Sequence, residues 1–428
     1  MRRYKIALFA SITISTIFVG TLIGLRIIAA SSPAKIEGIE DVAQRFDDFK
    51  IPADVRVVGI GEATHGNREF QTVKRDVLEK VVKEGDGRCI CFEMSVGEAA
   101  MFNDAIHDKD ADLTEIVGKQ SYPIYDTEDI VGLLEWMRDY NEGLSYEESL
   151  MFYGVDMQGP SCTVNYLQDL CRKGSDLITE EEKDKLLSID KDSRDELIAN
   201  REFFLNMSER LSAIDDIRCR QLALAPKDVV LGIDAPDSER DSSGYQDYRD
   251  LKMAENLMEY SGIEEKRGYS QVVITAHSGH ERVARDSEIT GKASWKNMGY
   301  HIERLTEGSY FCIGTGFYEG YVNIHTAGTY DDEYERADHF YRSEDPLAYQ
   351  AKYFENGTYC LDFSKVTDKN SSVYKKVHGA IFCGGLGEGY APIWELNSAV
   401  CRDKMVPAES YDAIIYYYEI TPIATLHY

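Results

Sequence analysis

Short apolar runs recur along the 428-residue chain, and the segments between them carry apolar residues at helical spacing. The run "DVRVVGIGEATHG" (54–66) is followed by Phe70, Val73, Val77 and Leu78, which recur every three or four residues until Gly85. Similar runs occupy residues 87–95, 148–159, 269–280, 308–320, 358–364, 379–385 and 411–420, with 321–328 as a hairpin partner of 308–320. Strands that alternate with helices predict an α/β fold with a largely parallel central sheet flanked by helices.

The pattern changes between residues 163 and 265, where charged sequence of helical period replaces the strand-like runs. Strand-like runs resume after this segment. It is therefore predicted to be a mostly helical insertion rather than a separate domain. Residues 33–428 are then expected to form one α/β domain.

The first 32 residues differ in composition from the rest. The basic start "MRRYK" precedes Ile6–Leu25, a run without a charge. About 20 apolar residues suffice to cross a bilayer, and basic residues before such a helix keep the N-terminus inside the cell. Small residues after Arg26 leave a cleaved signal peptide as the alternative to a signal anchor. Residues 6–30 are thus expected to make the protein a single-pass protein of the cell membrane, or a secreted protein if they are cleaved.

The net charge of the chain is −28, from 47 basic and 75 acidic residues. Such a surface repels the phosphates of nucleic acids, so no nucleic-acid partner is expected. Charge of one sign also keeps protein molecules apart in solution.

Polar side chains stand at the ends of four strand-like runs, where a buried core would not need them. They are Glu62 and His65 after the first run, Glu93 at the end of the second, Asp156 at the end of the third, and His277 and His280 at the end of the fourth. Ligands of open α/β sheets bind outside the carboxyl ends of the strands. Parallel strands would bring these groups together as a site, although each alone could equally be a structural side chain.

Two kinds of chemistry suit histidines beside carboxylates. Glu62 can hold the ring of His65 in one tautomer and stabilise its imidazolium, so that the histidine acts as general base toward water. A nucleophilic serine of the α/β-hydrolase kind is disfavoured, because Gly-x-Ser-x-Gly does not occur. The alternative is a divalent metal ion shared by His277 and His280, with Glu62, Glu93 or His65 completing the ligands.

These residues lie in motifs that resemble the erythromycin esterase family. The stretch "GIGEATHGNREF" is similar to the signature of that family. It is followed, in the order of the family, by "FEMSVGEA", "LLEWMRDYN", "FYGVDMQG", "YRDLKMAENL", "ITAHSGHERVAR", "NMGYHIERLTEGSYFCIGTGFYEG" and "YDAIIYYYEITPIATL". The series covers residues 40–426, nearly the whole of the expected domain.

The resemblance implies an α/β fold in which the inserted helices form a cleft, and hydrolysis of a carboxylic ester such as a macrolactone by a histidine that activates water, without a serine nucleophile. A small-molecule ester is then the expected substrate. No cofactor is expected, apart from the metal ion left open as the alternative. His65 would be the general base, Glu62 its partner, and Glu93 and His277 further catalytic groups. Residues expected to bind substrate are His280, Lys74, Arg138, Asp156 and Arg249. Lys74 stands where the family often has arginine; as a point charge it could stabilise an oxyanion without the bidentate geometry of arginine. Structural ion pairs are the alternative for both arginines, and helix capping is the alternative for Asp156.

The family does not fix the substrate. Macrolide inactivation, and with it antibiotic resistance, concerns a drug that acts on cytoplasmic ribosomes. An extracellular catalytic domain would instead meet a cell-surface ester, a polysaccharide substituent or a secreted metabolite. The alternative from another class is a non-catalytic binding or cell-envelope biogenesis protein that uses the same cleft. A pure binder needs no general base, so the presence of both Glu62 and His65 favours an enzyme.

Overall fold

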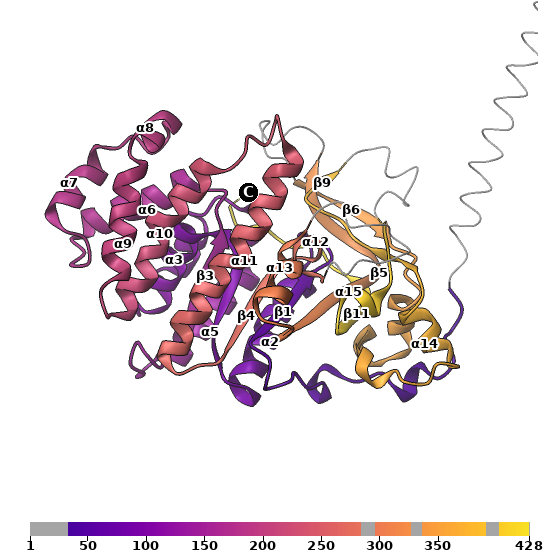
Figure 1. Ribbon diagram of the computed structural model, residues 1–428. Helices are drawn as coiled ribbons and strands as arrows, with labels where there is room; N and C mark the ends of the chain where they lie inside the picture. Colours follow the sequence, from indigo (N-terminus) through magenta and orange to yellow (C-terminus); the bar gives the residue numbers. More distant parts are fainter. Residues whose placement is uncertain (1–32, 284–295, 327–335, 391–401, 428) are drawn as a thin grey trace, which may run out of the picture.

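The sheet at the centre of the molecule is mostly parallel (Figure 1). The computed structural model describes residues 33–283, 296–326, 336–390 and 402–427, and within these ranges the sheet has nine strands. They are β1 (Val57–Glu62), β2 (Gly87–Ser95), β3 (Met151–Asp156), β4 (Gln271–His277), β5 (Tyr310–Thr326), β6 (Arg336–Arg342), β7 (Thr358–Asp362), β9 (Gly389–Tyr390) and β11 (Ala413–Ile420). A separate antiparallel pair consists of β8 (Ile381–Gly384) and β10 (Arg402–Met405).

The strand order is β3-β2-β4-β1-β5-β11-β7. Each neighbouring pair from β3 to β11 is parallel, and β7 runs antiparallel to β11. The carboxyl half of β5 extends beyond this arrangement and pairs with β6 and β9. The predicted α/β fold with a largely parallel central sheet flanked by helices is confirmed.

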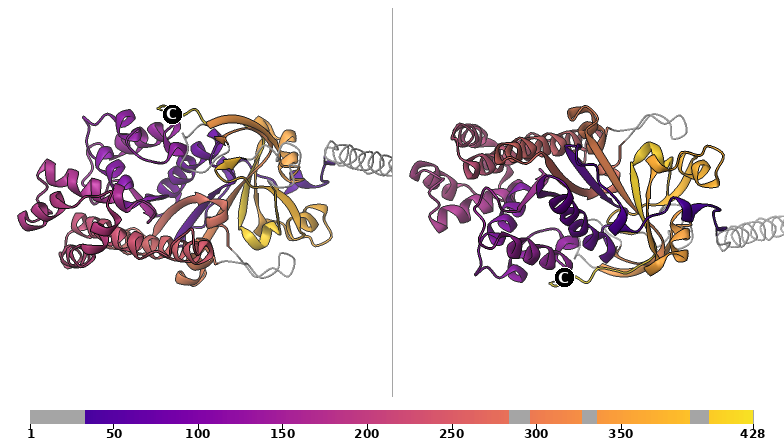
Figure 2. Two further views of the ribbon diagram at one scale, coloured as in Figure 1. Left: turned by 90° about the horizontal axis from the view of Figure 1, so that it is seen from above. Right: turned by 90° about the horizontal axis from the view of Figure 1, so that it is seen from below.

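Helices cover both faces of the sheet (Figures 1 and 2). Successive residues of a strand point to opposite faces. Val57 therefore packs in the core formed with α10 and α11, and Val58 packs in the core formed with α2 and α5. The α-helices are α2 (Arg68–Glu84), α3 (Val96–Ile106), α4 (Leu113–Val117), α5 (Glu128–Asn141), α6 (Pro160–Lys173), α7 (Glu180–Ser188), α8 (Arg194–Ala199), α9 (Arg201–Ser212), α10 (Ile217–Asp234), α11 (Ser242–Arg267), α12 (Ser278–Glu281), α13 (Met298–Leu305), α14 (Ser372–Val377) and α15 (Pro407–Ser410). Short 3₁₀ helices occupy Ile39–Asp41, Phe46–Asp48, Pro123–Tyr125, Ala348–Tyr353, Glu355–Gly357 and Phe363–Lys365.

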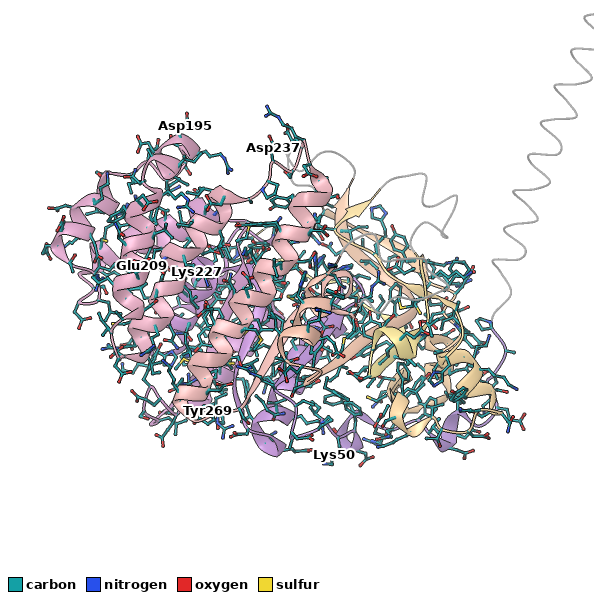
Figure 3. All side chains as sticks on the ribbon, in the orientation of Figure 1. Lys50, Asp195, Glu209, Lys227, Asp237 and Tyr269 are labelled. Atoms are coloured by element: carbon teal, nitrogen blue, oxygen red, sulfur yellow. The ribbon has the colours of Figure 1, made fainter. Side chains whose placement is uncertain are left out.

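The regular structure between β3 and β4 consists of the helices α6–α11; α11 packs on the face of β2, β3 and β4, and α7–α9 lie beyond the β3 edge of the sheet (Figure 1). Helix α7 begins at a capping box, in which Thr179 and Glu182 satisfy each other's backbone N–H groups. Asp195, Glu209 and Lys227 extend from this helical layer toward solvent (Figure 3). The segment predicted as a helical insertion (163–265) lies in this layer, and the proposed domain boundaries at 32 and 33 stay a prediction.

The predicted hairpin between residues 308–320 and 321–328 is wrong, because β5 continues through Gly320 to Thr326 and its antiparallel partner is β6. Gly320 has a φ of +151°, and a Cβ there would lie 2.1 Å from the carbonyl oxygen of Ile420. Glycine therefore lets β5 pass close to β11 without turning back.

No helix in the described ranges combines the length and the apolar character that membrane crossing requires. The longest of them, α11, has 26 residues but carries charged side chains along its length. This finding contradicts the prediction of a single-pass membrane protein with an extracellular catalytic domain. Residues 6–30, on which that prediction was based, lie outside the described residues.

Candidate active site

The carboxyl ends of four adjacent parallel strands carry the polar groups that the sequence singled out. Glu62 ends β1, in register with His277 at the end of β4. Glu93 lies near the end of β2, and Asp156 ends β3. His65 and His280 follow β1 and β4 within a few residues. The parallel arrangement therefore collects these groups at one edge of the sheet, as an open α/β sheet does for its ligands.

His65 and Glu62 form a direct pair, with 3.0 Å between His65 Nδ1 and Glu62 Oε1. Burial by itself would lower the pKa of His65. The hydrogen bond and charge of Glu62, with the charges of Glu93 and Glu388, outweigh burial and raise that pKa above its ordinary value. Burial would raise the pKa of Glu62, but the charge of Lys74 and the contact with His65 lower it. Glu62 is therefore held as an anion beside the ring.

Lys74 lies behind Glu62 rather than at a substrate surface. It comes from α2, its side chain is 0% exposed, and its Nζ is 3.0 Å from Glu62 Oε2. The ammonium also donates to Gln71 Oε1 at 2.9 Å and faces the ring of Tyr125, 4.9 Å from the ring centroid. The expected role of Lys74 at a substrate oxyanion does not fit this position, because Glu62 and the core enclose the ammonium.

Arg249 links two carboxylates at neighbouring strand ends. Its Nη2 lies 2.6 Å from Glu93 Oε1 and 2.6 Å from Asp156 Oδ2, and its Nε donates to Asp156 Oδ1 at 3.0 Å. All three side chains are buried. Burial would raise the pKa of Glu93, but the charges of His280, Arg249 and His65 lower it strongly. Arg249 thus contacts Glu93 directly and is itself held by Asp156, so Asp156 supports Glu93 only through the guanidinium.

His277 is held as a neutral ring with a defined tautomer. The backbone N–H of Gly279 donates to Nδ1 at 3.1 Å, which leaves the ring proton on Nε2, 3.3 Å from the carbonyl oxygen of Leu386. Burial and the nearby charge of His65 lower the pKa of His277 to about 4. The backbone N–H of His277 donates to Glu93 Oε2 at 2.8 Å. The His277 ring lies against that of His65, with centroids 4.8 Å apart.

His280 uses both of its ring nitrogens inside the protein. Nε2 lies 3.0 Å from Arg249 Nη1, which can only donate, so in the neutral form of the ring the proton is on Nδ1 and is donated to Asp250 Oδ1 at 2.7 Å. Asp250 is fully buried and also accepts from the backbone N–H of Met298. Asp250 therefore fixes the orientation of His280.

The three histidines differ in how many of their ring nitrogens already have a hydrogen-bond partner within the protein. His277 and His280 have both ring nitrogens within reach of protein partners. For His65, Nδ1 contacts Glu62, and Nε2 has no hydrogen-bond partner among the described residues. The His65 side chain is 12% exposed. If Nδ1–H donates to Glu62, Nε2 presents a lone pair toward solvent, as a general base requires.

Arg138 does not join this group in the contacts described. It lies on α5, and its Nη1 donates to the backbone carbonyl of Ala111 at 2.9 Å. This contact belongs to the packing of α5 against the segment before α4. The contact is structural, but it is a hydrogen bond to a carbonyl and not the ion pair that was considered as the alternative for Arg138.

Sequence reasoning missed three contributors to the site. Asp250 directly follows Arg249 in "YRDLKMAENL", and that adjacency was the available signal. The carbonyl of Leu386 and the carboxylate of Glu388 come from the glycine-rich segment "GGLGEGY", in which Leu386 directly follows the strand-like run 379–385, and that position was the available signal. Leu386 reaches the site because its backbone N–H donates to the carbonyl of Ala63 at 2.9 Å.

The donor set does not suit a metal ion at His277 and His280. The nitrogen lone pairs that would bind the ion already face N–H donors of Gly279 and Arg249. In the described part of the chain, no group of three or more His, Cys, Asp or Glu is arranged to hold a metal. The metal alternative therefore gains no support from this geometry.

The fold and site define an α/β protein with a histidine–carboxylate group at the carboxyl edge of a mostly parallel sheet. The family model described as erythromycin esterase matches residues 82–420, more than half of the chain. The chain therefore belongs to the erythromycin esterase family. The matched range includes Glu93, His277 and His280 and begins after His65.

Individual relatives are distant. The chain is 28% identical over 129 residues to "Erythromycin esterase type II" of Escherichia coli, and the match spans 29% of this chain and 29% of that protein. The solved structure of a succinoglycan biosynthesis protein is similar over 91% of this chain and 97% of that protein's chain, with a TM-score of 0.66 and 17% sequence identity. A second solved structure is that of the erythromycin esterase EreC in its open conformation, with one histidine replaced by asparagine. It is similar over 87% of this chain and 92% of the EreC chain, with a TM-score of 0.57 and 13% sequence identity. At these identities the structural likeness shows the fold.

Proposed function

We propose that this protein is a carboxylic ester hydrolase in which His65 activates water. The observation that carries the proposal is the unequal use of the three histidines. Of these three, only His65 combines a carboxylate on one ring nitrogen with no partner on the other among the described residues. Membership of the erythromycin esterase family supports the reaction class.

In the proposed reaction, His65 Nε2 takes a proton from water as the water oxygen attacks the ester carbonyl carbon. The imidazolium that forms is stabilised by Glu62, which is kept anionic by Lys74. The proton then passes to the alkoxide oxygen as the C–O bond breaks, and the products are a carboxylic acid and an alcohol. In the same proposal His277, whose ring centroid is 4.8 Å from that of His65, would donate Nε2–H to a substrate oxygen in place of the Leu386 carbonyl.

The first substrates to test are simple esters and a macrolactone, because the family is named for hydrolysis of erythromycin. A non-catalytic binding or envelope-biogenesis role is the alternative. The engagement of His277 and His280 in internal hydrogen bonds would suit either role. The availability of His65 Nε2 favours the enzyme, because binding alone does not require an unoccupied base held by a carboxylate.

The test uses the full chain with p-nitrophenyl esters and erythromycin, and follows p-nitrophenolate release and the gain of one water by mass spectrometry. We expect turnover, and about a 100-fold or greater loss of kcat in His65→Ala, as for removal of a general base. His378→Ala is the matched control, because His378 is exposed at the end of α14 and should retain the rate. Activity should also survive treatment with EDTA.

Two results would overturn the proposal. One is the absence of turnover of every ester by a folded protein, and the other is full activity in a folded His65→Ala variant. The first result would favour the binding role. Circular dichroism establishes that each variant is folded.

A further inference from the structure

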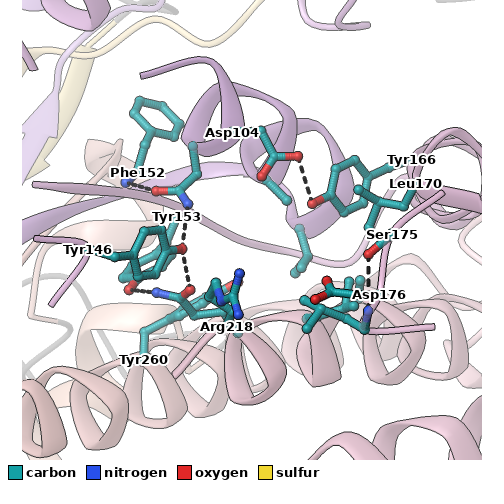
Figure 4. A pocket seen from close by; sticks show the side chains of 17 residues that line it. Asp104, Tyr146, Phe152, Tyr153, Tyr166, Leu170, Ser175, Asp176, Arg218 and Tyr260 are labelled. Atoms are coloured by element: carbon teal, nitrogen blue, oxygen red, sulfur yellow. Dashed lines mark hydrogen bonds between the residues drawn. The ribbon is translucent and has the colours of Figure 1, made fainter. Parts of the chain in front are cut away.

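A cavity of about 230 Å³ lies between the edge strand β3 and helices α3, α6, α10 and α11 (Figure 4). Its lining includes Phe152 and Tyr153 near the amino end of β3, whereas the histidines stand at the carboxyl ends of the strands. None of the histidines or carboxylates described above lines this cavity. The cavity is therefore separate from the candidate active site.

The innermost lining is apolar and aromatic. It consists of the buried side chains Val96, Tyr153, Leu222, Ala225 and Tyr260, together with the backbone of Phe152, whose ring packs on the other face of the sheet. Tyr153 and Tyr260 stack on each other with ring centroids 4.1 Å apart. Rings held in this way give a ligand a flat, rigid surface with little loss of side-chain entropy.

Polar groups line the sides of the cavity. The hydroxyl of Tyr146 donates to Gln221 Oε1 at 2.6 Å, and Gln221 Nε2 donates to the hydroxyl of Tyr153 at 2.6 Å. On the opposite side, Tyr166 donates to Asp104 at 3.1 Å (Figure 4). Each hydroxyl oxygen retains a lone pair, and Gln221 retains an N–H. These groups can therefore both donate to a ligand and accept from it.

The charged residues that line the cavity are Asp104, Asp176 and Arg218, and all three are exposed. The buried lining has no charge to pair with an ionised ligand, so burial of such a ligand would be costly. A purely apolar ligand would displace water from the tyrosine and glutamine groups without replacing its hydrogen bonds. The lining thus suits a neutral ligand that has both an apolar face and several hydroxyls.

We propose that this cavity binds one neutral sugar ring. The C–H face of the ring packs on the aromatic lining, and its hydroxyls bond to Gln221, Tyr146 and the Tyr166–Asp104 pair. The volume is below the range of about 300–1,000 Å³ that drug-sized ligands need, which limits the occupant to a single ring. The proposal is independent of ester hydrolysis at His65.

Saturation-transfer difference NMR on the full chain tests this proposal with methyl glucoside, methyl galactoside and methyl mannoside as probes. Glucuronate and glucosamine are the charged counterparts, and phenol is the apolar one. We expect at least one neutral glycoside to bind with a Kd of about 1 mM, more tightly than the charged or apolar probes. Gln221→Ala and Tyr166→Phe should each weaken that binding about tenfold. His65→Ala should leave it unchanged.

Tyr166→Phe keeps the inference testable if Gln221→Ala does not fold, because it removes one hydroxyl bonded to an exposed carboxylate. The proposal is wrong if no neutral glycoside binds at about ten times that concentration. It is also wrong if a charged or apolar probe binds more tightly, or if folded Tyr166→Phe binds as well as the parent. Loss of binding in folded His65→Ala would place the sugar at the histidines and would likewise overturn it.

Discussion

Replacement of Lys74 by methionine tests whether the Glu62 anion depends on a buried cation. The ammonium is 3.0 Å from Glu62 Oε2, and the two side chains are 0% and 1% exposed. With an effective dielectric constant of about 20, the Coulomb attraction at this distance is about 5 kcal/mol. Methionine fills similar space and removes the burial cost of the ammonium, which offsets part of that loss. We therefore expect Lys74→Met to lower the free energy of unfolding by about 3 kcal/mol at neutral pH.

The loss should depend on pH in a defined direction. The pKa of Glu62 is lowered in the folded protein, from an ordinary value of 4.5. Its stabilising contribution is therefore present above pH 4.5 and is lost as the pH falls through the folded pKa. Without Lys74 that depression diminishes. The difference between Lys74→Met and the parent should be largest at neutral pH and should shrink in acid.

Urea unfolding of the full chain, followed by circular dichroism, measures the effect. Lys83→Met is the matched control on the same helix. Its ion pair with Glu79, at 2.6 Å, joins side chains that are 67% and 22% exposed, so the loss should stay below about 1 kcal/mol. Glu62→Gln combined with Lys74→Met should recover at least about 1 kcal/mol relative to Lys74→Met. The reasoning fails if Lys74→Met costs no more than Lys83→Met, or if the double variant recovers nothing.

Three further predictions concern the same site. The value of kcat/KM for ester hydrolysis should rise with pH through a midpoint above 6.5, because His65 must be neutral to act as base and its pKa is raised above 6.5. A midpoint at or below 6.5 would contradict this prediction. Arg249→Met leaves Glu93 buried without its cation and should lower the free energy of unfolding by about 3–5 kcal/mol in urea titrations, whereas a loss under about 1 kcal/mol would refute the assignment. Gly66→Ala would place a Cβ 1.9 Å from the carbonyl oxygen of Asn323. Because this contact must displace the loop after His65, kcat should fall about 100-fold. An unchanged kcat would refute this prediction.

The strand-end groups were predictable because strand-like runs and the residues that end them are local features of the sequence. Parallel strands share one carboxyl edge, so Glu62, Glu93 and His277 were expected to converge before any contact was known. The pairing of His65 with Glu62 was also predictable, since only three positions separate them. The β5 hairpin was not, because the continuation of the strand depends on the approach of Gly320 to the Ile420 carbonyl oxygen, about 100 positions away.

Sequence alone therefore determined which residue types stand at the strand ends and that they belong to an α/β sheet, because hydrophobic period and chain order encode both. Tertiary structure decided what each group does there. In the folded chain Lys74 is the buried partner of Glu62, and Arg249 contacts Glu93 although 156 positions separate them in the sequence. Both ring nitrogens of His277 contact protein groups, whereas His65 Nε2 has no partner among the described residues. Burial and hydrogen-bond partners arise from packing between remote segments, and local sequence patterns do not specify them.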